Sequence, residues 1–291
     1  MILQLRGASD FLGEIDWIAS QVQPADPCRF TFLETSYAVV HSDTSHGIQS
    51  GVREENLGRL ANELYSRIYC RVPADAADQL ATNGPGVDLA PSLARANETR
   101  SRPPSLEQAG FFSVSGEESW DADSAPVDVV RIYWNIAAKG AIALLGMLTA
   151  QLNRYRVPFR FKCMRHSLLY TRADAAVLYT PRSFASIVVQ IVHRCDPRIR
   201  PHLREKTPLF TRALRPGLAY AEDPGGNESF GQQRCRLLAS SMIAAFEQVA
   251  GARFEGSLLV EQLKRHGIDP LRPHLKPHSK DIDAFEMLEE A

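Results

Sequence analysis

Cationic side chains crowd one short stretch of the sequence, 157–181, which otherwise has the composition of a protein core. Burying a cation costs free energy unless an anion or a hydrogen-bond acceptor meets it. A group of cations between two apolar runs therefore predicts a binding site for an anion, and we interpret the anion as a phosphoryl group on a peptide. The group consists of Arg160, Lys162, Arg165, His166 and Arg172.

The run PFRFKC predicts a short strand that would position the centre of this group. Because alternate side chains of a strand point to opposite faces, Arg160 and Lys162 should share one face and Phe159 and Phe161 the other. Guanidinium groups suit bidentate phosphate binding, and a lysine can act as a base where cationic neighbours and desolvation lower its pKa. Further candidate phosphate ligands near the starts of other elements are Arg172, Lys206, Arg212 and Arg234.

Plainer structural roles compete with each of these assignments. Arg160 and Lys162 could lie on the solvent face of an amphipathic strand, Arg172 could pair with Asp174, and Arg234 could be a surface residue. Packing or supporting roles are expected for Tyr133, Asn135, Tyr170 and Tyr179.

Other classes of site are disfavoured by composition and motifs. Basic and acidic residues number 33 and 34, so bulk charge predicts neither nucleic acid nor a membrane as partner. The five cysteines are scattered, which argues against a disulfide framework and a structural zinc site.

No phosphate-binding GxxxxGK[ST] loop, GxGxxG fingerprint or HExxH pair occurs. We predict no metal and no cofactor. Without an apolar signal segment, the protein is expected to be cytoplasmic.

Strands and helices alternate after residue 126, which predicts an α+β fold with α/β-like alternation in the C-terminal two thirds. We expect a mixed sheet flanked by helices, with a helical N-terminal region at 1–75 packed on the core. The composition of 76–125 predicts a flexible loop or lid. Residues 126–291 are expected to form the catalytic core, continuous with 1–75.

Elimination of phosphate from phosphoserine or phosphothreonine matches this set of side chains. The reaction needs a base for the α-proton, donors for the enolate that develops at the peptide carbonyl, and a cationic clamp with a proton donor for the phosphate. A lysine of the group could supply the base. A histidine could be the acid because its pKa lies near working pH, and His41 and His166 are the available choices.

A family resemblance extends over residues 126–240. The sequence resembles the HopA-type type III effector family through RIYWN, the Gly140-Ala141 helix opening and PFRFK. It also shares the runs YTRADAAVLY, PLFTRAL, GLAYAEDP and SFGQQR. The N-terminal third matches only loosely, around Tyr37 and His41.

The resemblance implies a tailoring enzyme of ribosomal peptide pathways, such as those of thioamitides and class V lanthipeptides. There a kinase-like partner phosphorylates Ser or Thr of a precursor peptide, and the HopA-like protein is taken to eliminate phosphate to give dehydroalanine or dehydrobutyrine. By this resemblance Lys162 is the base, a histidine is the acid, and Arg172, Lys206, Arg212 and Arg234 contact phosphate. The alternatives are a non-catalytic module that binds a phosphorylated peptide and a subunit that activates the kinase.

Overall fold

A computed structural model describes residues 4–39, 47–70, 83–98, 110–118, 128–226, 228–249 and 254–289 of the chain. The chain divides into two compact units. Unit 1 comprises Met1–Tyr69 and Gly226–Ser279, and unit 2 comprises Cys70–Gly225 and Lys280–Ala291. These boundaries differ from the segments drawn from the sequence, because residues 226–279 pack against the N-terminal helices.

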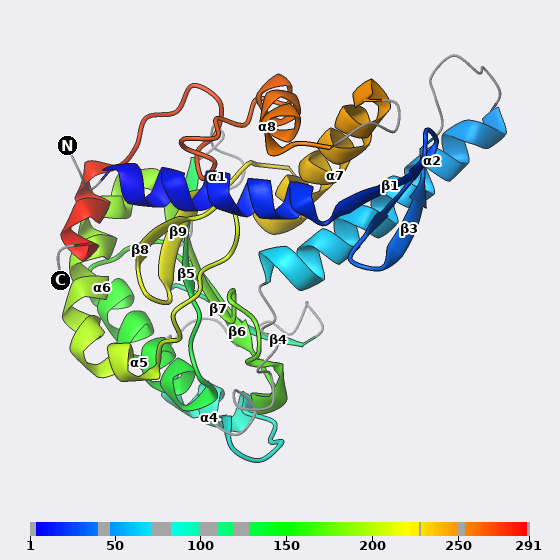
Figure 1. Cartoon of the computed structure of the whole chain (residues 1–291). Helices are drawn as coiled ribbons and strands as arrows, with labels where there is room; N and C mark the ends of the chain where they lie inside the picture. Colours follow the sequence, from blue (N-terminus) through cyan, green and yellow to red (C-terminus); the bar gives the residue numbers. More distant parts are fainter. Residues whose placement is uncertain are drawn as a thin grey trace. The chain divides into compact units, whose positions relative to one another are not determined.

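Unit 1 combines helices with a small antiparallel sheet (Figure 1). Helix α2 packs on α7, and α1 packs on α8. The N-terminal region therefore contains strands as well as the predicted helices. Its elements are α1 (Gln4–Ser20), β1 (Val22–Asp26), β2 (Arg29–Phe32), β3 (Thr35–Ala38), α2 (Gly47–Glu63), a π-helical turn (Leu64–Tyr69), α7 (Phe230–Val249) and α8 (Gly256–Arg265).

The SFG run at the start of α7 has a structural explanation within unit 1. The Ser229 hydroxyl accepts a hydrogen bond from the Gln232 amide at 3.3 Å, and the Gln232 side chain accepts one from the Ser229 amide at 3.3 Å. This reciprocal capping box makes Ser229, and not the neighbouring Glu228, the cap of α7. Gly231 is required because a Cβ there would lie 2.4 Å from the ring of Tyr69.

Unit 2 is built on a sheet of six strands in the order β4-β6-β7-β5-β9-β8. All neighbouring strands are antiparallel, so the α+β class is confirmed whereas the expected mixed sheet is not. Helix α5 (Ala138–Arg154) joins β5 to β6, but β7 lies between these strands and runs antiparallel to both. The strands are β4 (Phe111–Ser115), β5 (Val129–Trp134), β6 (Arg160–Met164), β7 (Ala176–Pro181), β8 (Arg212–Arg215) and β9 (Leu218–Glu222).

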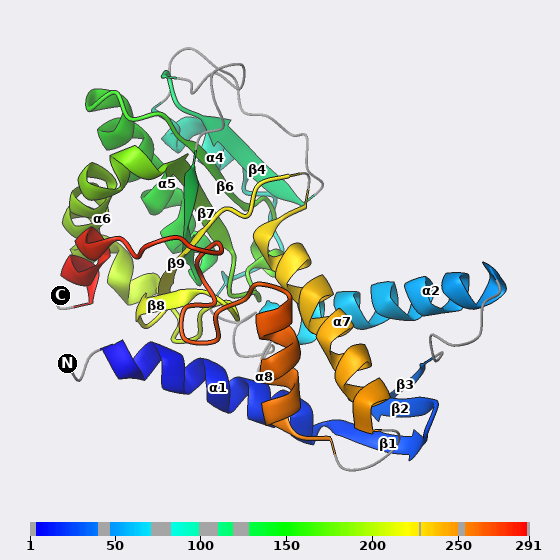
Figure 2. The ribbon, with the colours of Figure 1, turned by 90° about the horizontal axis from the view of Figure 1, so that it is seen from above.

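Helices α5 and α6 (Ala185–Ile199) lie on the same side of this sheet (Figure 2). The sheet face toward them carries Ile132, Trp134, Phe161, Leu178 and Leu218, all buried in one apolar cluster with residues of both helices. We call this the core face. The opposite face, which carries Lys162, is called the polar face.

The structure corrects the prediction that 76–125 forms a flexible loop in two described stretches. Residues Ala90–Ala96 form the short helix α4, which packs on α5. Phe111–Ser115 form the edge strand β4, paired along its length with β6. Phe112 and Val114 are buried at alternate positions, so a period-two apolar pattern outweighs the polar composition around it.

The start of α6 also differs from its prediction. Ser183 was expected to cap this helix, but it lies in a 3₁₀ turn, Arg182–Phe184, that precedes the helix. The residue at the cap position is Phe184, which makes no side-chain capping bond.

Arginines anchor the C-terminal segment 280–289 to unit 2 (Figure 1). Arg182 pairs with the buried Glu222 and donates a 2.5 Å hydrogen bond to the carbonyl oxygen of Lys280. The ring of Phe285 stacks on Tyr220 with centroids 4.0 Å apart. Among the described residues, no helix combines the length and the apolar character needed to cross a membrane.

Burial predicts very different reactivities for the five cysteines. Cys28 is exposed, whereas the other four are buried. Burial raises the pKa of Cys163 to about 12 and that of Cys195 to about 11, and the thiolate is the reactive form. Iodoacetamide at neutral pH should therefore label Cys28 in the native protein and the other four only after unfolding, as read by peptide mass spectrometry. A Cys28→Ser protein should stay unlabelled, and native labelling of Cys163 would contradict the buried placement.

Candidate active site

The register of the sheet places the predicted site residues on a common face. Lys162 pairs with Val177, and Val177 pairs with Tyr133. In the adjacent row Arg160 pairs with Tyr179, and Tyr179 pairs with Arg131. Because side chains in register and two residues apart share a face, these residues line the polar face together. The prediction that Arg160 and Lys162 lie opposite Phe159 and Phe161 is confirmed, because Phe161 is buried in the core while Arg160 is exposed.

Two aromatic rings contact the ammonium group of Lys162. Its Nζ lies 4.5 Å from the ring centroid of Phe111 on β4 and 5.7 Å from that of Tyr179 on β7. Such contacts hold a cation in place by attraction to the negative face of the ring. Arg172 also approaches the Phe111 ring, at 5.7 Å, so two cations from different segments meet at one phenylalanine.

Arg131 of β5 adds a cation that the sequence reasoning did not select. Its Nε donates a 2.6 Å hydrogen bond to Asp223, and its guanidinium lies 4.9 Å from the ring centroid of Tyr179. Burial alone would lower the pKa of Arg131, but Tyr133, Tyr179 and Asp223 together hold it above its usual range. The sequence could have indicated Arg131, because it is the single arginine within the mainly apolar run VDVVRIYW.

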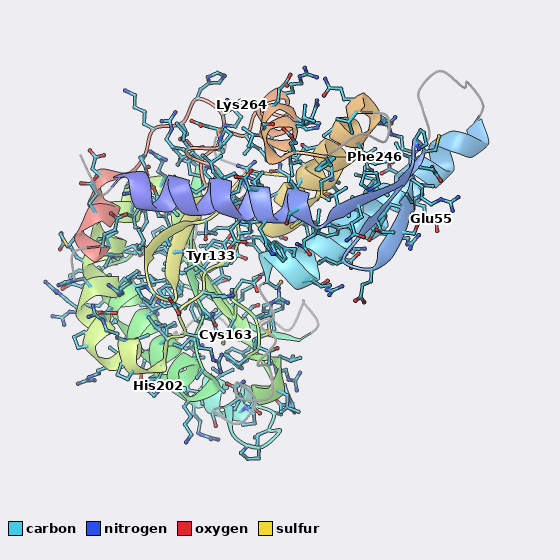
Figure 3. All side chains as sticks on the ribbon, in the orientation of Figure 1. Glu55, Tyr133, Cys163, His202, Phe246 and Lys264 are labelled. Carbon is cyan, nitrogen blue, oxygen red and sulfur yellow. The ribbon has the colours of Figure 1, made fainter. Side chains whose placement is uncertain are left out.

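Exposure changes steadily across the polar face. Arg160 is exposed, Lys162 and Tyr179 are half-buried, and Arg131 and Tyr133 are buried. Figure 3 labels Tyr133 on β5 and also Cys163 on β6, whose side chain belongs to the opposite, core face. A ligand would therefore reach Lys162 from the side of β4 and β6, and Lys162 stands at the boundary between solvent and the protein interior.

Arg172 pairs with Asp174, which the sequence allowed as an alternative to phosphate binding. It forms a two-point ion pair with Asp174, in which Nη2 donates to Oδ2 at 2.8 Å. Asp174 is buried, so this pair offsets the cost of burying the carboxylate. A contact of Arg172 with phosphate stays a prediction, since its guanidinium is already engaged by Asp174.

Asn135 fixes the loop that carries Lys206. Its side-chain amide donates a 2.9 Å hydrogen bond to the carbonyl oxygen of Lys206, and its own carbonyl accepts a bond from the Arg204 amide at 2.8 Å. Gly217 completes the support, since a Cβ there would lie 2.2 Å from the carbonyl oxygen of Arg204. Lys206 itself is exposed. The supporting role predicted for Asn135 is thus consistent with a contact to the backbone of Lys206.

Arg212 points away from this site. It pairs in register with Tyr220, which pairs with Ile132, so Arg212 belongs to the core face of the sheet. Its guanidinium forms ion pairs with Asp281 at 2.9 Å and Glu289 at 2.7 Å. The expectation that Arg212 contacts phosphate beside Lys162 is therefore corrected, because the sheet separates the two side chains.

Two other predicted residues cannot be grouped with the polar face. Arg234 belongs to unit 1, where its buried side chain donates a 2.8 Å hydrogen bond to the carbonyl oxygen of Leu275 and lies 5.1 Å from the ring centroid of Phe230. It links α7 to the segment that follows α8. His41, the predicted acid, lies outside the described residues.

His166 and Tyr170 occupy the turn that follows β6. His166 accepts a 3.3 Å hydrogen bond at Nδ1 from the Leu168 amide. His166 is four residues after Lys162 and two residues beyond the end of β6, at most roughly 13 Å away along the chain. The Tyr170 hydroxyl donates to the Met164 carbonyl at 2.7 Å, and burial raises its pKa well above its usual value. Tyr170 therefore supports the turn.

Comparisons with known proteins give one family match and two similar solved structures. The model of the HopA1 effector protein family matches residues 102–275. The effector protein from Pseudomonas syringae pv. tomato strain DC3000 is similar in structure, with a TM-score of 0.55 and 15% identity over 93% of this chain and 99% of that one. The effector protein from Pseudomonas syringae pv. syringae strain 61 gives a TM-score of 0.49 and 15% identity, over 76% of this chain and 96% of that chain.

A search of curated protein sequences found no match. The family model nevertheless covers more than half of the chain, including β5 to β9 and the whole polar face from Phe111 to Asp223. The chain belongs to the HopA1 effector protein family.

Proposed function

We propose that this protein is a lyase that eliminates phosphate from phosphoserine or phosphothreonine in a precursor peptide. The observation that supports the proposal is the position of Lys162. It is half-buried on the polar face, and its ammonium group contacts the rings of Phe111 and Tyr179. Arg160 and Arg131 lie on the same face. A base needs access to substrate together with partial exclusion of water, and the boundary position of Lys162 provides both.

In the proposed reaction Lys162 removes the α-proton of the phosphorylated residue. The electron pair of the Cα–H bond forms the Cα–Cβ double bond, the Cβ–O bond breaks, and phosphate leaves with the electrons of that bond. The products are dehydroalanine or dehydrobutyrine in the peptide and inorganic phosphate. Charge develops on the peptide carbonyl oxygen and on the departing phosphate, so hydrogen-bond donors at both places lower the barrier.

Roles for the neighbouring side chains follow from their exposure. Arg160 and Lys206 are exposed and suit contacts to the phosphoryl oxygens, while the buried Arg131 contributes a fixed positive charge behind Tyr179. Arg172, already paired with Asp174, acts by orienting Phe111 and the start of β7. His41 stays our proposed proton donor, since His166 lies beyond the end of β6, four residues along the chain from Lys162.

The proposed substrate must be phosphorylated elsewhere. The sequence contains no nucleotide-binding motif of the kinds considered, so a separate kinase-like protein would supply the phosphopeptide. The proposal therefore includes this kinase as a partner in the same pathway.

Incubation with a phosphorylated precursor peptide tests the proposal. Mass spectrometry should show loss of phosphoric acid and a phosphate assay should show matching release, with the unphosphorylated peptide unchanged. Addition of a thiol should then give a stable adduct at the new alkene. A phosphopeptide that stays intact both with and without the kinase-like partner would contradict the proposal.

A non-catalytic phosphopeptide-binding module is the second candidate. The contacts of Lys162 with the rings of Phe111 and Tyr179 favour it, because a lysine held in this way can bind a phosphoryl group as a cation without transferring a proton. Tight phosphopeptide binding without turnover, measured with the same peptide, would identify this function instead.

A further inference from the structure

An exposed apolar cluster lies at the end of β6, beyond Lys162. Val87, Leu168 and Leu169 are each more than 40% exposed, and they are three of the few large apolar side chains in the described residues that face solvent. Contiguous exposed apolar side chains mark binding surfaces more often than isolated ones do. We call these three residues the apolar cluster.

Hydrogen bonds hold the apolar cluster rigidly. Ser167 is buried, its amide donates to the Val87 carbonyl at 3.0 Å, and its hydroxyl donates to the Pro85 carbonyl at 2.7 Å. The same hydroxyl accepts from the Val87 amide at 2.9 Å. These bonds fix the backbone of the turn that carries both leucines, so a ligand would bind a turn that is already formed.

Close contacts connect the apolar cluster to the candidate active site. A Cβ placed on Gly110 would lie 3.5 Å from Leu169, so the leucine packs directly on this glycine. The next residue, Phe111, carries the ring that contacts Lys162. The surface from Leu169 through Gly110 and Phe111 to Lys162 therefore belongs to one edge of one sheet.

The distance along this edge suits an extended peptide. β6 ends at Met164, two residues after Lys162, and after a bend at Arg165 the extended residue His166 leads into the turn Ser167–Leu169, so the cluster begins at most roughly 13 Å along the chain from Lys162. An extended peptide whose phosphorylated residue lies at Lys162 would reach the cluster with a side chain about four or five residues away. A polar rim is present as well, because Arg165 and Asp88 form a partly exposed ion pair beside the cluster.

We propose that the apolar cluster is a specificity subsite that binds an apolar side chain of the phosphopeptide, about four or five residues from the phosphorylated position. This inference rests on the proposed function for the identity of the ligand. It adds a requirement that the reaction itself does not impose, namely an apolar residue at a fixed distance. Leu168 and Leu169 are specificity-determining residues in this account and take no part in the chemistry.

A binding experiment tests the subsite without depending on turnover. Dye-labelled phosphothreonine peptides would carry serine at the flanking positions except for one leucine, moved from two to seven residues away on either side of the phosphothreonine. Fluorescence anisotropy should show about tenfold tighter binding for a leucine four or five residues away than for the all-serine peptide. The preference should disappear in a Leu168→Ser/Leu169→Ser protein.

A Met287→Ser protein is the matched control, because Met287 is equally exposed in unit 2 but belongs to the C-terminal segment. It should keep the full leucine preference, and all proteins should melt at similar temperatures. Absence of a leucine preference, its persistence in the double variant, or failure of all the peptides to bind would overturn the subsite. A clear leucine preference in binding without any phosphate release would refute the lyase but would support the subsite.

Discussion

A Lys162→Ala protein should bind a phosphothreonine peptide within about threefold of the wild-type affinity yet release no measurable phosphate. The reason is that the proposed base would be missing while Arg160, Lys206 and the aromatic rings of the site stay in place. Removal of a catalytic proton acceptor lowers rates by about 10²-fold to 10⁴-fold. Single-turnover mass spectrometry measures the rate, and anisotropy measures the binding.

A Lys139→Ala protein is the control for this prediction. Lys139 is also a lysine of unit 2, exposed near the start of α5, on the helix that packs against the core face. Its loss should change neither the rate nor the affinity. Elimination at a normal rate by the Lys162→Ala protein would show that another residue is the base.

An Arg182→Ala protein should be less stable by about 3 kcal/mol, the second large effect that we expect. Removing one partner of a buried ion pair leaves an uncompensated charge, which costs about 3 to 5 kcal/mol. Glu222 is only 2% exposed, whereas Arg182 is partly exposed, so the lower end of this range applies. The variant also loses the bond to the Lys280 carbonyl. Urea denaturation followed by circular dichroism measures the change.

Two companion variants make the stability prediction specific. Arg236→Ala breaks an exposed pair with Glu228 and should cost under about 1 kcal/mol. Glu222→Gln in the Arg182→Ala background removes the buried charge and should restore part of the lost stability. Equal losses for Arg182→Ala and Arg236→Ala would show that burial of Glu222 is unimportant.

Local sequence patterns were sufficient to predict much of the fold. β5 follows a run of β-branched and aromatic residues, the Ser229 capping box marks the start of α7, and Gly267, with a positive φ, follows the end of α8. β4 was missed because five residues of apolar alternation lie within about fifty of polar composition. The antiparallel sheet was missed because strand order depends on contacts between residues far apart in the sequence.

The candidate site could also be predicted only in part, because the faces and ion-pair partners of its arginines depend on distant residues. Alternation within β6 correctly separated Lys162 from Phe161. It could not show that Arg212 faces the opposite side, because that depends on the register of β8 with β9. The carboxylates that pair with Arg212, Asp281 and Glu289, are about seventy residues away in the chain. Asp174 is only two residues from Arg172, and the sequence already offered that pairing as an alternative.

The path of the chain through the two units has a practical consequence. The backbone passes from one unit to the other at 69/70, at 225/226 and again at 279/280. Neither unit is an uninterrupted segment, so no simple truncation yields either one complete. A protein shortened after Ser279 would lack the strand-anchoring residues Asp281, Phe285 and Glu289 that belong to unit 2. Expression of unit 2 by itself therefore requires a new linker that joins residue 225 directly to residue 280.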